Sequence, residues 1–339
     1  MTQPANPSHK GVIFSGMRPT GLLHLGNYMG ALQNWVTLQE DYSCIYCAVD
    51  IHALTTLESG EDVKDIKPNI EDMILDWLAA GIDPEKSIVF VQSHVPEVMT
   101  LQALLSMVTP LGWLTRVPTF KDKVRQMSET EESVNYGLVG YPVLQTADII
   151  LYKADTVPVG QDQVPHIELS REIVRRFNNM FGETFPEPQA KLTEAPLLLG
   201  LDGQNKMSKT LDNHLDLAGT PEETTKRVLT AFTDPQRIRR DDPGRPEVCN
   251  VYSLHKIFSG AEATQTVYDE CTTAARGCVD CKRHLADSIN DYLKDLRERR
   301  EEIKARPGYV QEILHEGGKK ARAIAQETIA EVYEKMGLG

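Results

Sequence analysis

The stretch that decides the fold is Val12-Ile-Phe-Ser-Gly-Met-Arg-Pro-Thr-Gly-Leu-Leu-His-Leu-Gly-Asn27. Val12 to Gly16 is a short apolar run that stops at glycine, which is typical of a buried strand. Pro19 and Gly21 indicate a turn, and apolar residues then recur at helical spacing from Leu25 to Leu38. A strand, a turn and a helix in this order form the first unit of an α/β sheet.

The same alternation continues along the chain. Cys44–Val49 and Ser87–Gln92 are predicted strands, and Ile70–Ala80 is a predicted helix between them. Strands that alternate with helices favour a Rossmann-like parallel sheet with right-handed crossovers. Because ligands of such sheets bind at the carboxyl ends of the strands, we expect the functional site there.

The second part of the chain has a different character. From Pro221 onward almost no strand pattern remains, and long charged helices are predicted at His284–Ala305 and Val310–Met336, separated by Pro307 and Gly308. A chain of 339 residues has room for about two domains at roughly 150 residues each. We therefore expect an α/β catalytic domain over residues 1–214 and an all-helical domain over residues 215–339.

Composition narrows the class of protein. No apolar run approaches the ~20 residues that a membrane span requires, and the polar segment Met1–Lys10 has no apolar signal core, so a cytoplasmic protein without a membrane partner is expected. The formal net charge of −13 weighs against sequence-blind nucleic-acid binding. This net charge does not exclude an RNA partner that binds to a local basic face. One basic stretch, partly neutralised by neighbouring aspartates, is either such a face or a solvated loop: Arg237, Arg239, Arg240 and Arg245.

Two segments suit phosphate chemistry. Backbone N–H groups at the helix start after Gly26 form an anion site, and His24 and Asn27 lie one turn apart, able to donate to phosphate or ribose. Alone, such a glycine is as often structural. The second segment, Lys206-Met-Ser-Lys-Thr210, follows a glycine-rich polar loop. Two ammonium groups in one loop suit phosphoryl or nucleotidyl transfer, although a solvated lysine loop is the simpler alternative.

Together these segments carry a family resemblance. His24-Leu-Gly-Asn27 resembles the HIGH motif of class I aminoacyl-tRNA synthetases, and Lys206–Thr210 resembles their KMSKS motif. The resemblance runs from about Val12 to the last helix. Other stretches are similar to the tryptophanyl members of that class: Phe14-Ser-Gly16, Val49-Asp-Ile-His-Ala53, Tyr141-Pro-Val-Leu-Gln-Thr-Ala-Asp-Ile-Ile-Leu-Tyr152, Val157-Pro-Val-Gly-Gln-Asp-Gln163 and His166-Ile-Glu168.

Three positions depart from the usual pattern. Asn27 replaces the second histidine of the first motif, and Thr210 replaces the last serine of the second while keeping a hydroxyl group. Arg18 stands where many bacterial relatives have glutamine. These departures concern the details of ATP contact, and the activity is expected to remain.

The resemblance implies a tryptophan–tRNA ligase. Such an enzyme activates L-tryptophan with ATP to tryptophanyl-adenylate and transfers the amino acid to tRNA(Trp). It needs positioning and charge stabilisation rather than a covalent nucleophile, and its Mg²⁺ bridges phosphate oxygens. The helical domain is expected to meet the tRNA anticodon. A homodimer is also implied, with the apolar segment Met99–Gly112 as a candidate interface.

The resemblance also assigns residues to the ATP site. Its catalytic groups are Lys206, Lys209, His24 and Asn27. The residues that line the ATP site are Arg18, Pro19, Thr20, Gly26, Asn27, Gly160, Gln161, Asp162, Leu197, Lys206, Met207, Ser208, Lys209 and Thr210.

Specificity for tryptophan requires one hydrogen-bond acceptor, because the indole ring carries one N–H donor and no acceptor. Asp148 has the matching position, and its apolar flanks favour a buried carboxylate over one on a helix surface. A buried polar group of this kind rejects a ligand lacking the matching donor. The whole tryptophan set implied by the resemblance is Phe14, Val157 and Val159 as walls, Tyr141 and Gln163 at the α-amino group, Asp148, and His52 nearby.

The six cysteines fall into two groups. Cys44 and Cys47 lie three apart on a predicted strand, so they point to opposite faces and are expected to be core residues rather than a metal clamp. The other four, of which the last three share a face if that stretch is helical, suggest either Zn²⁺ or a [4Fe–4S] cluster: Cys249, Cys271, Cys278 and Cys281. A subgroup of bacterial tryptophanyl enzymes has a very similar motif that holds a [4Fe–4S] cluster, so the resemblance implies a cluster, with zinc as the alternative.

Three competing functions are considered. A tyrosine-specific class I synthetase would share the fold and the reaction, but its pocket should offer partners for a phenol hydroxyl. A small adenylyltransferase is disfavoured by the length of the chain and by the Lys206 loop. A catalytically dead paralogue that senses tryptophan or binds RNA is disfavoured because both lysines and the His24–Asn27 motif are present.

Overall fold

The computed structural model describes residues 10–55, 63–117, 120–121, 124, 134–193 and 198–339. Five parallel strands form one sheet in the order β3-β2-β1-β4-β5. This confirms the predicted parallel α/β sheet. The strands are β1 (Val12–Met17), β2 (Ser43–Ala48), β3 (Ser87–Val91), β4 (Thr156–Val159) and β5 (Gln189–Leu192).

The strand order reverses direction between β1 and β4. The chain first moves outward from β1 to β2 and β3, and then returns to place β4 on the other side of β1. Loops at the carboxyl ends of β1 and β4 therefore diverge and leave a crevice between them. The predicted location of the functional site follows from this reversal.

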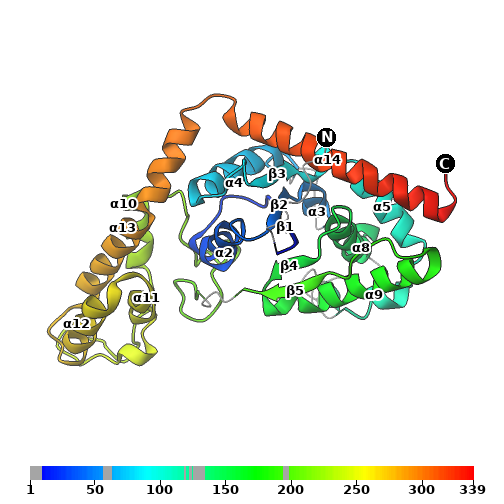
Figure 1. The fold of residues 1–339 in the computed structure, drawn as a ribbon. Helices are drawn as coiled ribbons and strands as arrows, with labels where there is room; N and C mark the ends of the chain where they lie inside the picture. Colours follow the sequence, from blue (N-terminus) through cyan, green and yellow to red (C-terminus); the bar gives the residue numbers. More distant parts are fainter. Residues whose placement is uncertain (1–9, 56–62, 118–119, 122–123, 125–133, 194–197) are drawn as a thin grey trace.

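Helices cover both faces of the sheet (Figure 1). The predicted helix over Leu25–Leu38 is present, but its middle turn is a π-helix, a feature often found near functional sites. The helices of this part of the chain are α1 (Leu25–Asn27), η1 (Tyr28–Leu32), α2 (Gln33–Leu38), α3 (Asp50–Leu54), α4 (Ile66–Ala80), η2 (Gln92–His94), α5 (Glu97–Ser106), α6 (Leu111–Leu114), α8 (Tyr136–Ile150), η3 (Gln161–Gln163) and α9 (Val164–Phe181).

Alternate residues of β2 pack into different cores. Cys44 and Tyr46 belong to the apolar cluster under α2 and α4, whereas Ile45 and Cys47 belong to the cluster under α5, α8 and α9. Both thiols are buried and free. The prediction that Cys44 and Cys47 are core residues on opposite faces is confirmed, since successive side chains of a strand alternate.

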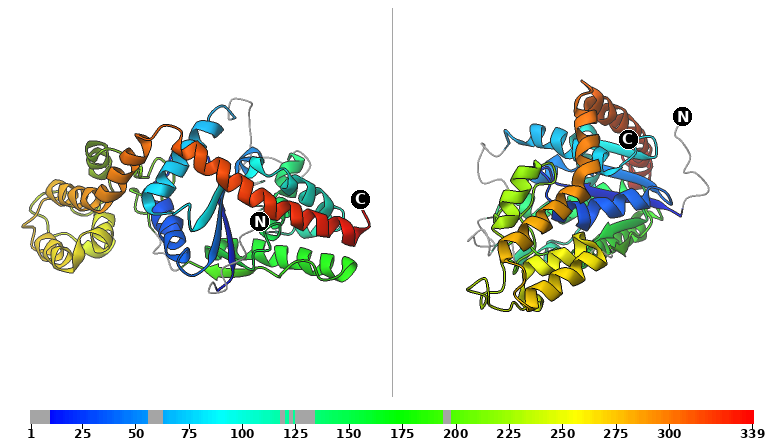
Figure 2. Two further views of the ribbon diagram at one scale, coloured as in Figure 1. Left: turned by 45° about the horizontal axis from the view of Figure 1, so that its top comes forward. Right: turned by 90° about the vertical axis from the view of Figure 1, so that its left-hand side faces the viewer.

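The helical region extends to one side of the sheet (Figures 1 and 2). The long helix α13 runs back to the sheet, and the chain turns at Pro307 and Gly308, where Gly308 has a φ of 77°. These helices are α10 (Pro221–Leu229), η4 (Pro246–Val248), α11 (Asn250–Phe258), α12 (Gly260–Thr272), α13 (Cys278–Lys304) and α14 (Tyr309–Met336). Among the described residues, none of these or the other helices is long and apolar enough to span a membrane.

The last helix returns to the catalytic part of the chain. Helix α14 lies alongside β3 and α5, and its buried residues Ala321, Ala325 and Val332 belong to the core on that side of the sheet. Gly317 makes the closest approach, because a Cβ atom built there would overlap the backbone carbonyl of Val89 in β3. Only a residue without a side chain allows the helix to lie this close to the strand.

Replacing Gly317 with alanine should therefore destabilise the fold. We expect Gly317→Ala to lower the free energy of unfolding by about 2 kcal/mol or more, because the helix must move away from β3. Gly112→Ala is a matched control, since Gly112 is helical and a Cβ there would meet nothing within 4 Å. Denaturant unfolding of both variants tests this, and equal stability of the two would contradict the close packing of α14.

Candidate functional site

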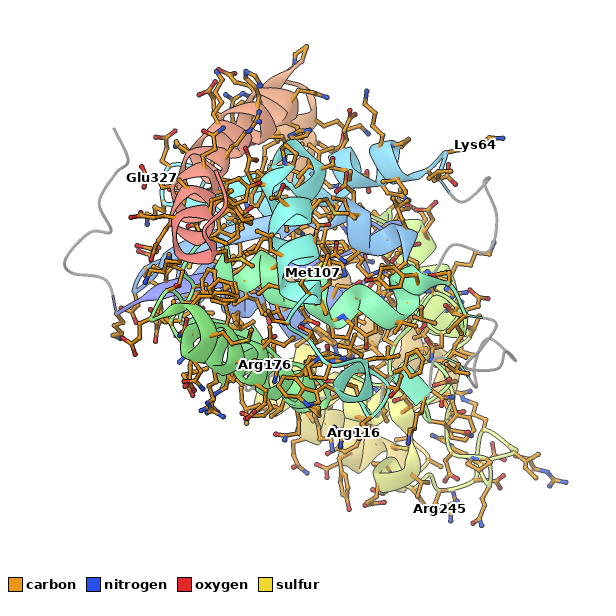
Figure 3. All side chains as sticks on the ribbon, turned by 90° about the vertical axis from the view of Figure 1, so that its right-hand side faces the viewer. Lys64, Met107, Arg116, Arg176, Arg245 and Glu327 are labelled. Carbon is orange, nitrogen blue, oxygen red and sulfur yellow. The ribbon has the colours of Figure 1, made fainter. Side chains whose placement is uncertain are left out.

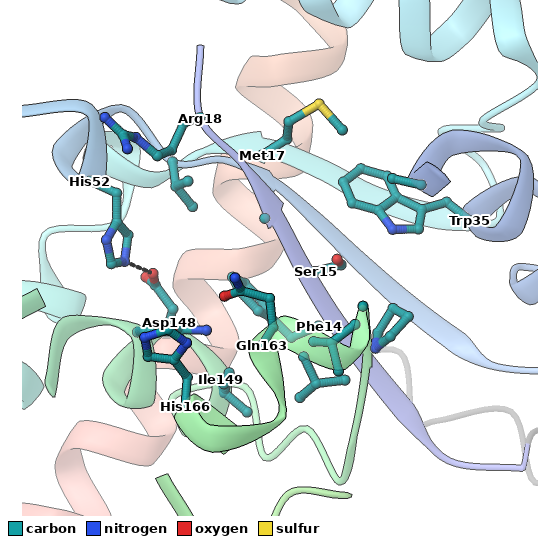
Figure 4. Close-up of a pocket in the computed structure, with 18 of the residues that line it drawn as sticks. Phe14, Ser15, Met17, Arg18, Trp35, His52, Asp148, Ile149, Gln163 and His166 are labelled. Carbon is teal, nitrogen blue, oxygen red and sulfur yellow. Dashed lines mark hydrogen bonds and ion pairs between the residues drawn. The ribbon is translucent and has the colours of Figure 1, made fainter. Parts of the chain in front are cut away.

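A cavity of about 500 Å³ opens at the carboxyl ends of β1 and β4 (Figure 4). The structure brings together here every residue that the sequence assigned to tryptophan, and it adds Arg18 and Gly160 of the predicted ATP set. The tryptophan set in the wall is Phe14, His52, Tyr141, Asp148, Val157, Val159 and Gln163. Phe14 is fixed by stacking on Tyr152, with ring centroids 5.6 Å apart.

Asp148 is a buried carboxylate, with 3% of its surface exposed. The predicted burial is confirmed. Helix α8 carries Asp148 to the cavity wall, where Gln92 Nε2 donates to both carboxylate oxygens at 2.8 Å. His52 Nε2 lies 2.9 Å from Asp148 Oδ2, the contact drawn dashed in Figure 4. These partners fix the orientation of the carboxylate.

Sequence reasoning missed Gln92. Its Oε1 accepts from the backbone N–H of Ile51 at 3.0 Å and of His52 at 3.3 Å, so one amide ties β3 to α3 and to Asp148. The available signal was its place at the end of the predicted strand Ser87–Gln92, where parallel sheets position functional side chains. Other lining residues without a predicted role include Gln145, Met17 and Thr55.

A second hydrogen bond orders the opposite wall. The Tyr141 hydroxyl lies 2.7 Å from His166 Nε2, and both side chains are buried. His166 is in the first turn of α9, and Tyr141 is in α8, so the bond joins the two helices that flank the cavity. His166 stood in a stretch that resembled the family, but no role was predicted for it.

The two segments that the sequence assigns to phosphate chemistry, His24–Asn27 and Lys206–Thr210, meet at Gly26. His24 is the N-cap residue of α1, and its backbone N–H donates to Asn27 Oδ1 at 3.0 Å, so these two residues cap the helix start. A Cβ on Gly26 would lie 3.0 Å from His24 Nδ1 and 3.2 Å from Met207 Cβ. Because there is no side chain at Gly26, the 206–210 loop can lie directly on the helix start.

A polar turn shapes the 206–210 loop. Asn213 Oδ1 accepts from the backbone N–H of Ser208 at 2.7 Å, and Asn213 Nδ2 donates to Asp202 Oδ2 at 2.9 Å. Burial raises the pKa of Asp202, but hydrogen bonds from Asn205, Asn213 and the backbone together outweigh that effect and lower the pKa to about 2. Lys209 then reaches Gly21, where a Cβ would lie 3.0 Å from the ammonium nitrogen.

Burial shifts the pKa values of His24 and Lys209, and neighbouring charged groups also act on them. Burial and, to a smaller extent, the neighbouring His214, Lys209 and Lys206 together lower the pKa of His24 to about 4. His24 is therefore neutral at pH 7. Burial also lowers the pKa of Lys209, while Asp216 and other acidic groups oppose this shift.

The remaining described residues of the predicted ATP set lie outside the tryptophan cavity and outside the contact between the 206–210 loop and the start of α1. Gln161 and Asp162 form an exposed turn after β4, where Asp162 Oδ2 accepts from Gln163 Nε2 at 2.8 Å. Pro19 and Thr20 lie in the turn after β1, and Thr210 is exposed at the end of the lysine loop. Leu197 lies outside the described residues.

The four remaining cysteines line one small cavity of about 20 Å³ in the helical region. Three of them would share a face only if the stretch were one helix, and it is not, because α12 ends at Thr272, α13 begins at Cys278, and Ala274 between them has a φ of 58°. Tertiary packing gathers them instead. Within the described residues, no three side chains of the types His, Cys, Asp and Glu are grouped closely enough to hold a metal ion. The cysteines are Cys249 before α11, Cys271 in α12, and Cys278 and Cys281 in the first turn of α13.

The predicted basic stretch divides into two kinds of residue. Arg245 forms an ion pair with Asp234 at 2.6 Å, and Arg237 donates to Cys271 Sγ at 3.6 Å, so both support the local fold. The Asp234 carboxyl has its pKa lowered by that guanidinium. Arg239 and Arg240 are exposed.

Comparison with known proteins agrees with this geometry. The family model of class I tRNA synthetases (W and Y) matches residues 6–294. The tryptophan–tRNA ligase of Thermotoga maritima is 47% identical, covering 96% of this chain and 99% of its own length. The ligase of that name from Aquifex aeolicus is 40% identical, with coverages of 96% and 99%.

Solved structures point the same way. The tryptophanyl-tRNA synthetase of Campylobacter jejuni, complexed with ADP and tryptophan, superimposes with a TM-score of 0.87 at 36% identity, covering 96% of this chain and all of that one. A tyrosyl-tRNA synthetase from Archaeoglobus fulgidus shares the fold alone, with a TM-score of 0.63 at 21% identity. Because the family model spans most of the chain and the tryptophan-specific relatives match nearly end to end, the chain belongs to the tryptophanyl-tRNA synthetases, the tryptophan–tRNA ligases of class I.

Proposed function

We propose that the cavity between β1 and β4 holds L-tryptophan with its indole N–H bonded to Asp148. The observation that carries this assignment is a buried carboxylate on the wall of a largely apolar slot. A carboxylate offers roughly four acceptor positions, and Gln92 and His52 use three of them. One position remains for the indole donor, and the partners keep the carboxylate aimed at it.

The other end of the amino acid lies toward the second hydrogen-bonded pair. Phe14, Val157 and Val159 form the apolar walls, while Tyr141 and Gln163 bind the α-amino group. The tryptophan carboxylate then faces the ATP site. There it attacks the α-phosphorus, pyrophosphate leaves, and tryptophanyl-adenylate forms. A ribose hydroxyl of the terminal tRNA adenosine next attacks the activated carbonyl group and loses its proton, and the carbon–oxygen bond to the phosphate breaks to release AMP.

ATP is proposed to lie along the helix start and the lysine loop. Gly26 admits the nucleotide close to the backbone, and neutral His24 can donate a hydrogen bond to a phosphate or ribose oxygen. Lys206 and Lys209 stabilise the charge that develops on the departing pyrophosphate. Mg²⁺ would be held mainly by phosphate oxygens, as few protein ligands are needed.

Transfer to tRNA is assigned to the helical part of the chain. We divide the protein into a catalytic domain over residues 1–214 and a tRNA anticodon-binding domain over residues 215–339. Exposed Arg239 and Arg240 are available to contact the RNA backbone, where arginine and lysine provide most of the affinity.

We propose that the cysteine cavity is the site of a metal group with thiolate ligands. Four thiols line it, Arg237 donates to Cys271 Sγ, and the Arg276 guanidinium, which also lines the cavity, offsets negative charge. We assign a [4Fe–4S] cluster to Cys249, Cys271, Cys278 and Cys281, with Zn²⁺ as the alternative. A bound cluster would cross-link the starts of α11 and α13 to α12, beside the exposed arginines.

Two further properties are proposed from the surface and the thiols. Met99, Met107 and Leu111 expose 43%, 78% and 64% of their surface, and Met107 is labelled in Figure 3. We assign this apolar segment to a homodimer interface. All six cysteines are free, which suits a reducing cytoplasmic compartment.

Removal of the Asp148 carboxylate should impair use of tryptophan. We expect Asp148→Ala to lower kcat/KM for tryptophan by on the order of 10²-fold or more in ATP–pyrophosphate exchange, because an apolar pocket alone discriminates modestly. Asp287→Ala, which removes an exposed carboxylate of α13, is the control. Wild-type protein should use tyrosine and phenylalanine far less well. Unchanged kinetics of Asp148→Ala would refute the indole assignment.

The neutral state of His24 makes a pH-dependent prediction. Its folded pKa of about 4 lies below the ordinary value of 6.5, so between these values the unfolded chain binds a proton that the folded chain does not. The contribution of His24 to stability is therefore complete above pH 6.5 and declines as the pH falls toward 4. NMR titration should place the His24 ring below pH 5. His24→Gln should lose less stability than wild type between pH 7.5 and 5, and equal losses would contradict the shift.

The metal assignment is tested by anaerobic purification with iron, sulfide and zinc analysis and a visible spectrum. Cys278→Ser should lose the cluster and impair tRNA charging more than pyrophosphate exchange, because no cysteine lies in the tryptophan or ATP clusters. Cys44→Ala, at a buried core thiol, should retain the iron. Zinc without iron would favour a tetrahedral zinc site instead of the cluster. If the protein contains neither iron nor zinc after reconstitution, the proposal is refuted.

A further inference from the structure

The contact between Tyr141 and His166 lies on the cavity wall, at the proposed position of the α-amino group. The Tyr141 hydroxyl oxygen is 2.7 Å from His166 Nε2, and the two rings are tilted by 59° with their centroids 5.5 Å apart. Both side chains are buried, and both line the cavity together with Gln163, which lies near His166 in Figure 4. A contact this short between buried polar atoms is a hydrogen bond, and its direction decides what Tyr141 offers to a ligand.

Packing between α8 and α9 fixes the position of the imidazole ring. About one turn further along both helices, Thr146 Oγ1 lies 2.9 Å from Ser170 Oγ, which makes a second polar contact between them. Ser170 Oγ also donates to the backbone carbonyl of His166 at 3.0 Å. All four side chains are buried, so His166 Nε2 is held beside the Tyr141 oxygen before any ligand binds.

The ligand group that Tyr141 is proposed to bind has only hydrogen-bond donors. The α-amino group of tryptophan is an ammonium at neutral pH, and like the ammonium of lysine it has three N–H donors and no acceptor. A tyrosine hydroxyl can both donate and accept, so it accepts from the ammonium only if its own hydrogen points elsewhere. A neutral imidazole with its proton on Nδ1 makes Nε2 an acceptor for that hydrogen.

We infer that His166 is a positioning residue whose Nε2 accepts a hydrogen bond from the Tyr141 hydroxyl, so that the Tyr141 oxygen accepts from the α-ammonium of tryptophan. This inference rests on the proposed α-amino role of Tyr141. His166 acts through Tyr141, and no proton is transferred. The pair then selects an indole ligand that carries an α-ammonium over the same molecule without one, while Asp148 selects the indole N–H at the other end.

The test compares two ligands on the full-length protein. Indole-3-propanoate has the indole ring and the carboxylate of L-tryptophan but lacks the α-amino group. His166→Leu should raise the dissociation constant of tryptophan roughly tenfold, because the hydrogen bond that orients the acceptor for a charged donor is lost, while that of indole-3-propanoate should stay nearly unchanged. Calorimetry, with indole-3-propanoate competing against tryptophan, measures both constants.

A conservative variant should restore part of the effect. The amide oxygen of His166→Gln can accept from the Tyr141 hydroxyl, so this variant should lose less affinity for tryptophan than His166→Leu. If His166→Leu does not fold, His166→Met takes its place in the same comparison, because the unbranched methionine side chain adapts to irregular cavities.

Two controls separate this role from a structural one. Ser170→Ala removes the neighbouring polar contact between α8 and α9 but keeps the Tyr141 hydroxyl and the imidazole, so the ratio of the two dissociation constants should keep its wild-type value. In a Tyr141→Phe background, His166→Leu should not change that ratio further, because no hydroxyl remains to orient.

The outcomes distinguish the inference from the function on which it rests. Equal weakening of both ligands by His166→Leu, or a change of the ratio that persists without the Tyr141 hydroxyl, would overturn the role of His166. If Tyr141→Phe alone leaves the ratio unchanged, the proposed α-amino role of Tyr141 is refuted, and the inference fails with it.

Discussion

The close approach of the 206–210 loop to the first helix start is the contact on which the site depends. Gly26 has no side chain, so Met207 and the His24 ring pack directly against its backbone. Two segments about 180 residues apart in sequence thereby meet beside the first helix start. The backbone hydrogen bond from Leu25 N–H to Leu215 O, at 2.8 Å, fastens the exit of the loop to the same helix.

The proposed specificity for tryptophan rests on a different arrangement, in which one polar group is buried and almost fully satisfied. Asp148 would be costly in an apolar slot without Gln92 and His52, because a buried charge needs partners. Those partners also remove its freedom to rotate. A preorganised acceptor of this kind rejects a ligand that lacks the matching donor, because the buried acceptor is then left without a hydrogen bond. That free-energy penalty is larger than the one caused by the loss of a few apolar contacts.

The C-terminal helices link these two sites to the rest of the molecule. Helix α13 holds the cysteine cavity at one end and Arg300 near the other, a span of roughly 40 Å for 27 residues. Helix α14 then lies on β3, where Gly317 permits a contact too close for any side chain. The helical region is thus fastened to the sheet through the buried ion pair of Arg300 with Asp76 of α4, at 2.7 Å, and through an apolar core.

The sequence by itself determined features that depend on local pattern. The strand, turn and helix over Val12–Asn27, the opposite faces of Cys44 and Cys47, and the burial of Asp148 all follow from the periodicity of neighbouring side chains. The tertiary structure alone decided which distant groups meet. Gln92 reaches Asp148 across 56 positions, and three helices bring the four cysteines to one cavity. Such contacts depend on how whole elements pack, and local residue spacing carries no record of that packing.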